Sequence, residues 1–230
     1  MNKNLMNPQI GVSSFQNKIK LLLLENRKAI MSVLVGKKAP DFTVPAVLAD
    51  GTIVDEFTFS EAAKGKMSIV FFYPLDFTFV CPSELIAFDH RLQDFKDRGV
   101  NVIGCSVDSQ FSHFAWRETP INNGGIGRVG YPLVADLTKS ISKDYDVLFG
   151  EAVALRGSFL IDAKGIVRHS VVNDLPLGRN IDEMLRMVDT MQFTDEHGEV
   201  CPAGWVKGDE GMKATTEGVA EYLGKHESEL

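Results

Sequence analysis

The side chains best able to do chemistry in this chain gather around Cys81. Thr78 stands three residues before the cysteine, Glu84 three residues after it, and Pro74 seven residues before it. Pro82 follows the cysteine directly and favours the first turn of a helix, where the missing proline N–H costs nothing. The dipole of a helix stabilises a thiolate at its N-terminus. We therefore predict a reactive cysteine at position 81.

A thiolate of this kind can attack the O–O bond of a peroxide and become a sulfenic acid. An unperturbed thiol is only about 3% ionised at pH 7, so backbone N–H groups and a cation must stabilise the anion. The leaving oxygen develops negative charge and needs donors placed in advance. The Thr78 hydroxyl is expected to reach this pocket, Pro74 to shield it from water, and Glu84 to hold a guanidinium through a charge-assisted pair.

The three cysteines, Cys81, Cys105 and Cys201, are too few for the disulfide framework of a secreted protein. This count favours a reducing compartment, so we expect a cytoplasmic protein in which any disulfide is transient. The sequence has no CxxC motif and its five histidines lack the spacing of zinc ligands, so we expect no metal. Cys105 lies in the apolar run 102–107 and is expected to be a packing residue.

Composition and charge exclude several classes of protein. The 230 residues are 44% hydrophobic and 24% charged, which is typical of a soluble globular chain. A net charge of −7 argues against non-specific nucleic-acid binding, although it leaves room for a local basic pocket. The apolar run 21–24 is far shorter than the roughly 20 residues that span a bilayer. We expect no nucleic-acid partner and no membrane partner.

The elements that must position these residues alternate between strand and helix patterns. Strands are expected over 68–73, 100–107 and 133–135, helices over 82–97 and 109–118, and a helical turn over 138–145. A hairpin is expected over 158–162 and 166–173, followed by a helix over 180–191 with Asn180 as its cap. This order predicts an α/β fold with a mixed central sheet flanked by helices.

The chain divides into three parts on these patterns. Residues 1–31 are expected to form a flexible N-terminal extension, in which 19–30 has the pattern of a short amphipathic helix. Residues 32–193 are expected to form the main domain. Residues 194–230 are expected to be a mobile C-terminal tail that carries Cys201, with a turn at 195–198 and a last helix over 218–223.

The segment Pro74-Leu-Asp-Phe-Thr78-Phe-Val-Cys81 resembles the Pro-x-x-x-Thr-x-x-Cys motif of peroxiredoxins. A second motif, Val200-Cys201-Pro-Ala-Gly-Trp205, follows it, and the similarity runs from about Val35 to the end of the chain. The chain is similar to typical two-cysteine peroxiredoxins, the class that includes the peroxidase subunits of bacterial alkyl hydroperoxide reductases. The resemblance implies a thioredoxin-like peroxidase domain over 32–193. It also implies a thiol-dependent peroxidase without metal, haem or flavin of its own.

By that resemblance, Cys81 is the peroxidatic cysteine and Cys201 is the resolving cysteine of the partner subunit in a homodimer. Arg156 matches the active-site arginine of the family, and nothing else in the sequence selects it from the other arginines. The implied substrates are hydrogen peroxide and organic hydroperoxides. Thioredoxin or a flavoprotein disulfide reductase would then reduce the disulfide.

The resemblance also implies a larger assembly, because relatives close dimers into rings that are commonly decamers. The edge strand 166–173 would pair two subunits, and Phe77 and Phe79 would form the second interface that closes the ring. The charged residues Arg168 and His169 are expected to lie on a solvated edge.

Two other functions stay open on the sequence alone. The first is a stress-induced holdase chaperone, built from the ring and its tails. The second is a thioredoxin-type dithiol carrier, which is weaker because the two cysteines do not form a CxxC motif.

Two glycine patterns need separate interpretation. The run Gly124-Gly-Ile-Gly127 matches a family loop associated with overoxidation, but Tyr222-Leu223 replaces the Tyr-Phe pair of sensitive relatives, so we predict intermediate sensitivity. The stretch 125–130 fits the dinucleotide pattern GxGxxG, yet it lacks the preceding strand and the following helix which that motif requires.

Overall fold

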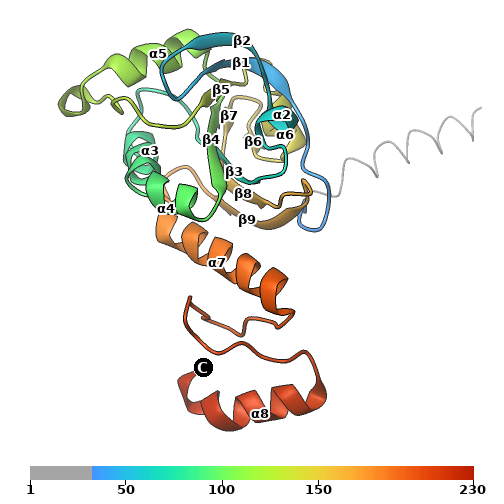
Figure 1. Ribbon diagram of the computed structural model, residues 1–230. Helices are drawn as coiled ribbons and strands as arrows, with labels where there is room; N and C mark the ends of the chain where they lie inside the picture. Colours follow the sequence, from blue (N-terminus) through green and yellow to red (C-terminus); the bar gives the residue numbers. More distant parts are fainter. Residues whose placement is uncertain (1–32) are drawn as a thin grey trace, which may run out of the picture. The chain divides into compact units, whose positions relative to one another are not determined.

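A seven-stranded mixed sheet forms the centre of the computed structural model, which describes residues 33–230 (Figure 1). The strands follow the order β2-β1-β5-β4-β3-β8-β9 across the sheet. They are β1 Thr43–Val47, β2 Ile53–Thr58, β3 Met67–Phe72, β4 Val100–Ser106, β5 Leu133–Ala135, β8 Arg156–Ile161 and β9 Val167–Asn173. The pairs β3–β4 and β4–β5 are parallel and the others antiparallel, so the predicted mixed sheet is confirmed.

Helices cover both faces of this sheet, as its two-sided burial requires. On one face Ile69, Phe71 and Tyr73 join a core formed with α3, α4, α5 and α7. On the other face Val70 and Phe72 join a second core near α2, α6 and the small β6–β7 sheet. The helices are α2 Phe59–Ala62, α3 Cys81–His90, α4 Leu92–Asp97, α5 Gln110–Glu118, α6 Ser140–Asp144, α7 Ile181–His197 and α8 Thr216–His226. Strand β6 is Leu148–Phe149, strand β7 is Val153–Ala154, and 3₁₀ turns span Ile121–Asn123 and Glu227–Glu229.

The predicted helix 82–97 is two helices, α3 and α4, separated at Arg91. The backbone of Arg91 has φ −98° and ψ 3°, and its guanidinium binds Asp182 at 2.7 Å. Leu85 before the break and Phe95 after it are both buried in the same core. The apolar periodicity therefore continues across the break, which is why the sequence pattern indicated one helix.

Helix α7 is longer than predicted, and it includes residues 195–197 of the segment that was expected to form a turn. It runs to His197, and Gly198 ends it with a left-handed φ of +69°. The expectation of a turn over 195–198 is therefore wrong, and the boundary drawn after residue 193 falls inside a helix. The predicted cap is confirmed, because the Asn180 side chain accepts a hydrogen bond from the Asp182 N–H.

Strands β1 and β2 lie at one end of the sheet and were missed by the sequence patterns. Pro45 interrupts the alternation of β1, where the register with β2 shifts between Val44 and Ala46. Proline is tolerated at such a bulge because it has no N–H to pair. The resulting sequence of β1 does not show the regular alternation of a half-buried strand.

Strand β9 forms the other end of the sheet, and β8 is its only partner among the described strands. Arg168 is exposed and contacts Asp162 and Asp195. His169 is half-buried, and burial lowers its pKa below the usual histidine value. The expectation of a solvated edge holds for Arg168 and is wrong for His169.

The chain after Gly198 folds back on itself and on the end of α7. Val200 pairs with Met212 in an isolated bridge, and Trp205 is buried with its ring 4.9 Å from that of Phe193. Helix α8 is capped by Thr215 and contains the predicted last helix. Among residues 33–230, no helix combines the length and apolar character needed to cross a membrane. The predicted extension over 1–31 and its helix lie outside the described residues.

Candidate active site

Cys81 lies where β3 ends and α3 begins, at the carboxyl edge of the parallel strands. The chain leaves β3 through the buried residues Tyr73 and Pro74, and Cys81 is the first residue of α3, with Val80 as its N-cap. The Cys81 side chain is 0% exposed. The sulfur is therefore held at a helix N-terminus and shielded from bulk water.

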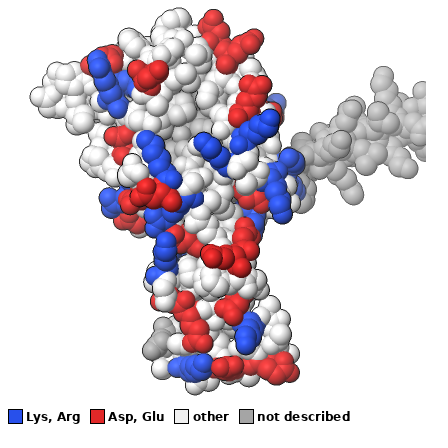
Figure 2. Space-filling model, viewed as in Figure 1, with Lys and Arg blue, Asp and Glu red and all other residues white. Residues whose placement is uncertain are grey.

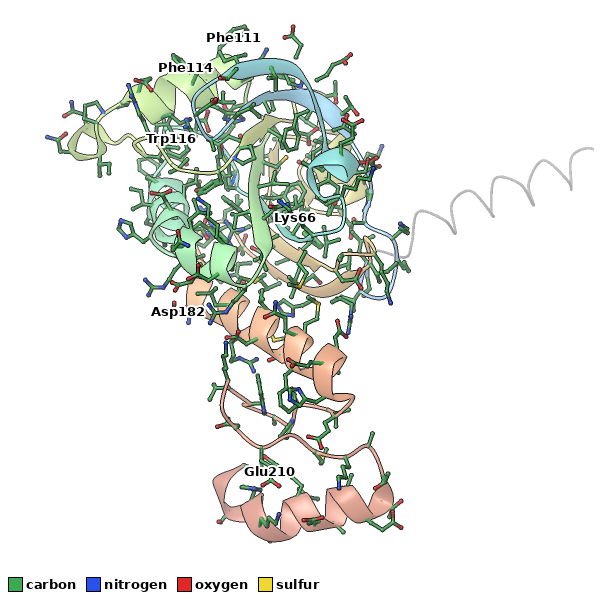
Figure 3. All side chains as sticks on the ribbon, in the orientation of Figure 1. Lys66, Phe111, Phe114, Trp116, Asp182 and Glu210 are labelled. Atoms are coloured by element: carbon green, nitrogen blue, oxygen red, sulfur yellow. The ribbon has the colours of Figure 1, made fainter. Side chains whose placement is uncertain are left out.

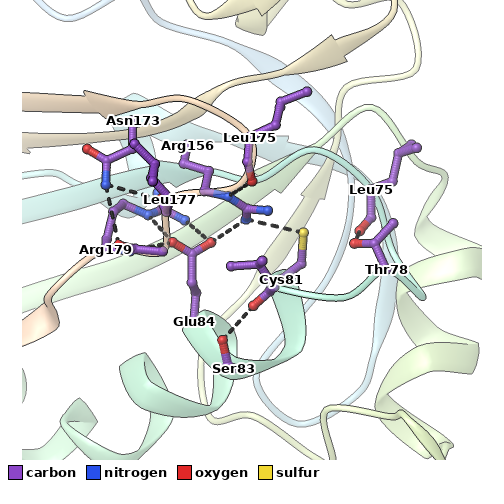
Figure 4. Close-up of polar contacts among 12 residues, drawn as sticks. Leu75, Thr78, Cys81, Ser83, Glu84, Arg156, Asn173, Leu175, Leu177 and Arg179 are labelled. Carbon is purple, nitrogen blue, oxygen red and sulfur yellow. Dashed lines mark hydrogen bonds and ion pairs between the residues drawn. The ribbon is translucent and has the colours of Figure 1, made fainter.

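Arg156 brings a positive charge to this sulfur. It begins β8, the antiparallel neighbour of β3, and its Nη1 donates to Cys81 Sγ at 3.4 Å (Figure 4). Its Nε donates to the Leu175 carbonyl at 2.7 Å, which fixes the plane of the guanidinium. Burial lowers the Arg156 pKa, but the hydrogen bond to Cys81 and the charge of Glu84 raise it above the usual value. The side chain can therefore act as a permanent cation beside the sulfur.

Glu84 lies between two guanidinium groups one turn into α3. Its Oε2 accepts from Arg156 Nη1 at 2.6 Å and from Arg179 Nη2 at 2.9 Å, and its Oε1 accepts from Arg179 Nε at 2.8 Å. Burial raises the Glu84 pKa, yet the hydrogen bonds and charge of Arg179, with the charge of Arg156, bring it below the usual carboxyl value. One carboxylate between two cations leaves excess positive charge beside Cys81.

Arg179 is a site residue that sequence reasoning missed. It precedes the cap of α7, and its Nη1 also donates to the Gly157 carbonyl at 2.6 Å and to Ser158 Oγ at 3.1 Å. Its guanidinium lies 5.4 Å from the centre of the Phe71 ring. No local pattern selects this arginine, because its carboxylate partner lies 95 residues away in the chain.

Thr78 lies in the loop before Cys81, with its hydroxyl turned toward the loop itself. Its Oγ1 donates to the Leu75 carbonyl at 2.8 Å (Figure 4). No hydrogen bond joins Thr78 to Cys81 in the part of the chain that the structure describes. The bond to Leu75 orients the hydroxyl so that its oxygen lone pairs remain available as acceptors.

A buried polar network anchors this loop to α5. Asp76 accepts hydrogen bonds from Tyr73 at 2.9 Å and from Ser112 at 2.7 Å, and its Oδ2 lies 2.9 Å from His113 Nδ1. Burial raises the Tyr73 pKa well above its usual value, so its hydroxyl stays protonated as a donor. Trp116, labelled in Figure 3, adds a ring contact to Phe77 with centroids 5.8 Å apart. The loop that precedes Cys81 is thus held in one conformation.

The other two cysteines lie apart from this cluster. Cys201 is half-buried against α7, with its Sγ 3.7 Å from both the Thr190 carbonyl and Thr194 Oγ1. Cys105 is buried in β4, and burial raises its pKa well above the usual thiol value. All three cysteines are free. Of the predicted site residues, the structure therefore brings together Cys81, Glu84 and Arg156, and places Cys201 against α7 without a hydrogen bond to them within residues 33–230.

Comparison with known proteins agrees with this fold and site. Residues 35–170 match the AhpC/TSA family, and residues 190–225 match the C-terminal domain of 1-Cys peroxiredoxin. Alkyl hydroperoxide reductase C of Helicobacter pylori (strain ATCC 700392 / 26695) is 61% identical over 198 residues, which cover 86% of this chain and 100% of that protein. Peroxiredoxin-2 of Mus musculus is 53% identical over 193 residues, which cover 84% of this chain and 96% of that protein.

Solved structures show the same fold. The reduced 2-Cys peroxiredoxin of Plasmodium vivax matches with a TM-score of 0.81 and 50% identity, over 84% of this chain and 99% of that one. A thioredoxin-like sheet that presents a buried cysteine to an arginine defines an enzyme of the thiol-dependent peroxidase class. The chain belongs to the AhpC/TSA family of peroxiredoxins.

Proposed function

We propose that this protein reduces hydrogen peroxide and organic hydroperoxides with Cys81 as the nucleophile. The contact between Arg156 Nη1 and the fully buried Cys81 Sγ, at 3.4 Å, is the observation that carries this assignment. The thiolate attacks the terminal peroxide oxygen, an S–O bond forms, and the O–O bond breaks. The leaving oxygen takes a proton and departs as water or an alcohol, and Cys81 remains as sulfenic acid.

The neighbouring side chains have distinct roles in this step. Arg156 contacts the sulfur and offers donors to the negative charge that develops on the oxygens. The Thr78 oxygen accepts the hydrogen of the peroxide and so orients it for attack. Glu84 and Arg179 are positioning residues that hold Arg156 in place. Pro74, which is buried beside Tyr73, excludes water from the pocket.

Resolution of the sulfenic acid requires the first turn of α3 to open. That turn is closed by bonds from the Ser83 and Glu84 N–H groups to the Val80 carbonyl, and a buried sulfur cannot otherwise reach a second thiol. Cys201 of a second subunit then attacks the sulfenic acid, which gives a disulfide and releases water. An external dithiol protein, thioredoxin or a flavoprotein disulfide reductase, reduces this disulfide and completes the cycle.

A homodimer supplies the second subunit in this proposal. No described strand pairs with the outer edge of β9, where Val167 exchanges backbone hydrogen bonds with Gly36 and Lys37. The exposed apolar residues Val172 and Leu177 lie further along this strand and just after it. Phe77 and Phe79 are also exposed, with Phe79 at 96%, which supports a further contact that closes dimers into a decamer. We place the enzyme in the cytoplasm because its cysteines are few and free.

Mixing two variants tests both the residue roles and the subunit exchange. Cys81→Ser should abolish turnover, and Cys201→Ser should allow one oxidation without recycling by dithiol. After peroxide treatment, the native protein should migrate as a covalent dimer on a non-reducing gel, and neither variant alone should do so. An equimolar mixture of the two variants, refolded together, should restore a cross-linked band. A native disulfide confined to single chains would contradict the intersubunit bond, and turnover by Cys81→Ser would contradict the nucleophile.

The holdase chaperone expected as an alternative has no specific support in the site or among the relatives. The dithiol carrier is also disfavoured, because Cys81 is buried beside Arg156 while Cys201 lies against Thr190 of α7, so the two thiols of one subunit do not form a pair.

A further inference from the structure

A groove lined by lysines crosses the molecule at the edge where β3 and β4 begin. It consists of three adjoining hollows of about 320, 390 and 200 Å³. The first two share Gly65 and Ala163, and the last two share Lys96, Val100 and Asn101. We call it the lysine groove; its lysines are Lys38, Lys64, Lys66, Lys96 and Lys164. The groove lies at the start of β3 whereas Cys81 follows its end, and no active-site residue lines the groove, so the lysine groove is distinct from the active site.

The lysines of this groove have almost no internal partners. Lys64, Lys66, Lys96 and Lys164 make no side-chain hydrogen bond or ion pair within residues 33–230, and Lys38 Nζ donates only to a backbone carbonyl, at 3.0 Å. In Figure 2, several basic side chains lie across the face shown, with acidic ones above and below them, and Figure 3 labels Lys66 in this region, just before β3. In a chain of net charge −7, these five cations form a local positive field.

The carboxylates that line the lysine groove are engaged in their own turns. Of the described residues, Asp41 and Asp162 are the two acidic ones in its walls. Asp41 Oδ1 accepts from the N–H groups of Phe42 and Ser60. Asp162 Oδ1 accepts from two backbone N–H groups of the β8–β9 turn, and its Oδ2 lies 3.5 Å from an Arg168 nitrogen. Neither aspartate forms an ion pair with a groove lysine.

The third hollow has a different chemistry from the first two. Its walls are mainly apolar and include Leu92, Val102, Tyr131 and Pro132. Asn101 lies where this hollow meets the second one, and its Nδ2 donates to the Ala62 carbonyl at 3.1 Å, which leaves its own carbonyl oxygen able to accept. A ligand that fits the whole groove therefore has two parts. An uncharged ring that carries a hydrogen-bond donor occupies the apolar hollow, and a chain of negatively charged groups lies along the lysines.

We propose that the lysine groove binds a nucleoside polyphosphate. The base occupies the apolar hollow beside Asn101, and the phosphates extend past Lys96 and Lys66 toward Lys64. The two larger hollows fall in the range of about 300–1,000 Å³ that small-molecule sites occupy. Lysine is an effective phosphate ligand as a mobile point charge. A simple inorganic polyanion would use the lysines and leave the apolar hollow empty.

Equilibrium titration of the full-length reduced protein tests this proposal. The probes are ATP, inorganic triphosphate and adenosine, each at low ionic strength and without divalent cations, so that charge screening is small. ATP is expected to saturate one site per chain and to bind at least about tenfold more tightly than either of the other probes. Absence of saturable ATP binding, or equal affinity for inorganic triphosphate, would overturn the proposal.

Charge-reversal variants locate the site. The double variant Lys64→Glu, Lys66→Glu should weaken ATP binding by at least about tenfold, because two attractive contacts become repulsive. The control is Lys143→Glu, Lys207→Glu, which makes the same change in net charge at exposed lysines outside the groove. The control should bind ATP as tightly as the native protein does. An equal loss of ATP affinity in both double variants would show that net charge alone causes the loss, and it would contradict binding in the lysine groove.

A third variant addresses the apolar hollow separately. Ala62 is exposed on α2 and lines this hollow, so Ala62→Trp should fill it without disturbing the core. We expect this variant to bind ATP only as tightly as inorganic triphosphate, whose affinity should not change. Unchanged ATP affinity would contradict the placement of the base. Native peroxide turnover in every variant serves as the check of correct folding.

Discussion

Glu84 neutralises only one of the two buried guanidinium groups that contact it. Arg156 and Arg179 both bind its oxygens, at 2.6 to 2.9 Å, and Arg156 also reaches the sulfur. At the scale of single residues, the site is therefore a cationic pocket whose geometry depends on one carboxylate. Two predictions belong to this scale.

Replacement of Arg156 by lysine should lower kcat/KM for peroxide by about 100-fold, the size of effect seen when one transition-state donor is lost. A single ammonium group cannot donate at once to Cys81, Glu84 and the Leu175 carbonyl, as the guanidinium does. Steady-state kinetics with excess reductant measures the change. Arg98→Lys removes a comparable bidentate contact to Asp189 away from the site, so it should leave kcat/KM unchanged. A fall of similar size in both variants would contradict the role of Arg156.

Replacement of Glu84 by glutamine should lower the free energy of unfolding by about 3 kcal/mol at pH 7, because two buried cations lose their counter-charge. The Glu84 pKa is lowered in the folded protein, so its contribution is complete above the ordinary carboxyl pKa of 4.5 and is lost as the pH falls below that value. The difference in the free energy of unfolding between the native protein and Glu84→Gln, measured by urea unfolding, should therefore become smaller below pH 4.5. A gap that stayed constant with pH would contradict this account.

At the scale of elements, α3 is tied to the loop between α5 and β5. Tyr131 donates its hydroxyl hydrogen to the Leu85 carbonyl at 2.7 Å, and the Gly130 N–H donates to Asp89 Oδ1 at 2.7 Å. Both contacts lie beyond the first turn of α3. They hold the part of the helix that continues directly from the first turn, so they oppose the opening of that turn which we propose for resolution.

Replacement of Tyr131 by phenylalanine should weaken this hold by about 1 kcal/mol, the worth of one hydrogen bond. The first turn should then open more readily, so Cys201 should capture the sulfenic acid sooner and less sulfinic acid should form at high peroxide. Mass spectrometry of Cys81 after graded peroxide treatment measures this yield. Tyr145→Phe is the control, because that buried hydroxyl donates to Pro40 on the opposite face of the sheet. An unchanged yield in Tyr131→Phe would show that the loop does not limit opening.

At the scale of the whole molecule, the positions of the two thiols in one subunit bear on how the proposed cycle closes. Cys201 Sγ lies 3.7 Å from Thr190 and Thr194 of α7, whereas Cys81 is fully buried and its Sγ accepts from Arg156. A second copy paired along β9 is the arrangement that we propose to bring the two thiols together. The intermediate sensitivity to overoxidation expected from Tyr222-Leu223 stays a prediction.

Replacement of Val172, which is 45% exposed on β9, by glutamate should place like charges across the paired strands and convert dimers to monomers. Sedimentation velocity should show the change in mass. The first oxidation of Cys81 should keep its rate, whereas recycling by dithiol should fail. Val219→Glu, at a similarly exposed position on α8, should keep the native mass. A Val172→Glu dimer that still recycles would contradict pairing through β9.

Features that depend on neighbours along the chain could be predicted from the amino-acid sequence. The apolar run of β3, the helix start at Cys81, the cap at Asn180 and the strands β8 and β9 all follow from short-range spacing. They were predictable because the burial of alternate residues, the proline after the cysteine and the side-chain cap act over a few residues.

The set of distant side chains that meet at the sulfur could not be predicted from local spacing, because it depends on how the chain folds in three dimensions. Arg156 lies 75 residues from Cys81, and the pairing of β3 with β8, register Phe71 to Ser158, brings them together. Arg179 reaches Glu84 through the packing of α7 against α3. The break between α3 and α4 at Arg91 and the bulged strand β1 were likewise not predictable from the sequence. These features depend on strand order and packing across the core, which no local spacing encodes.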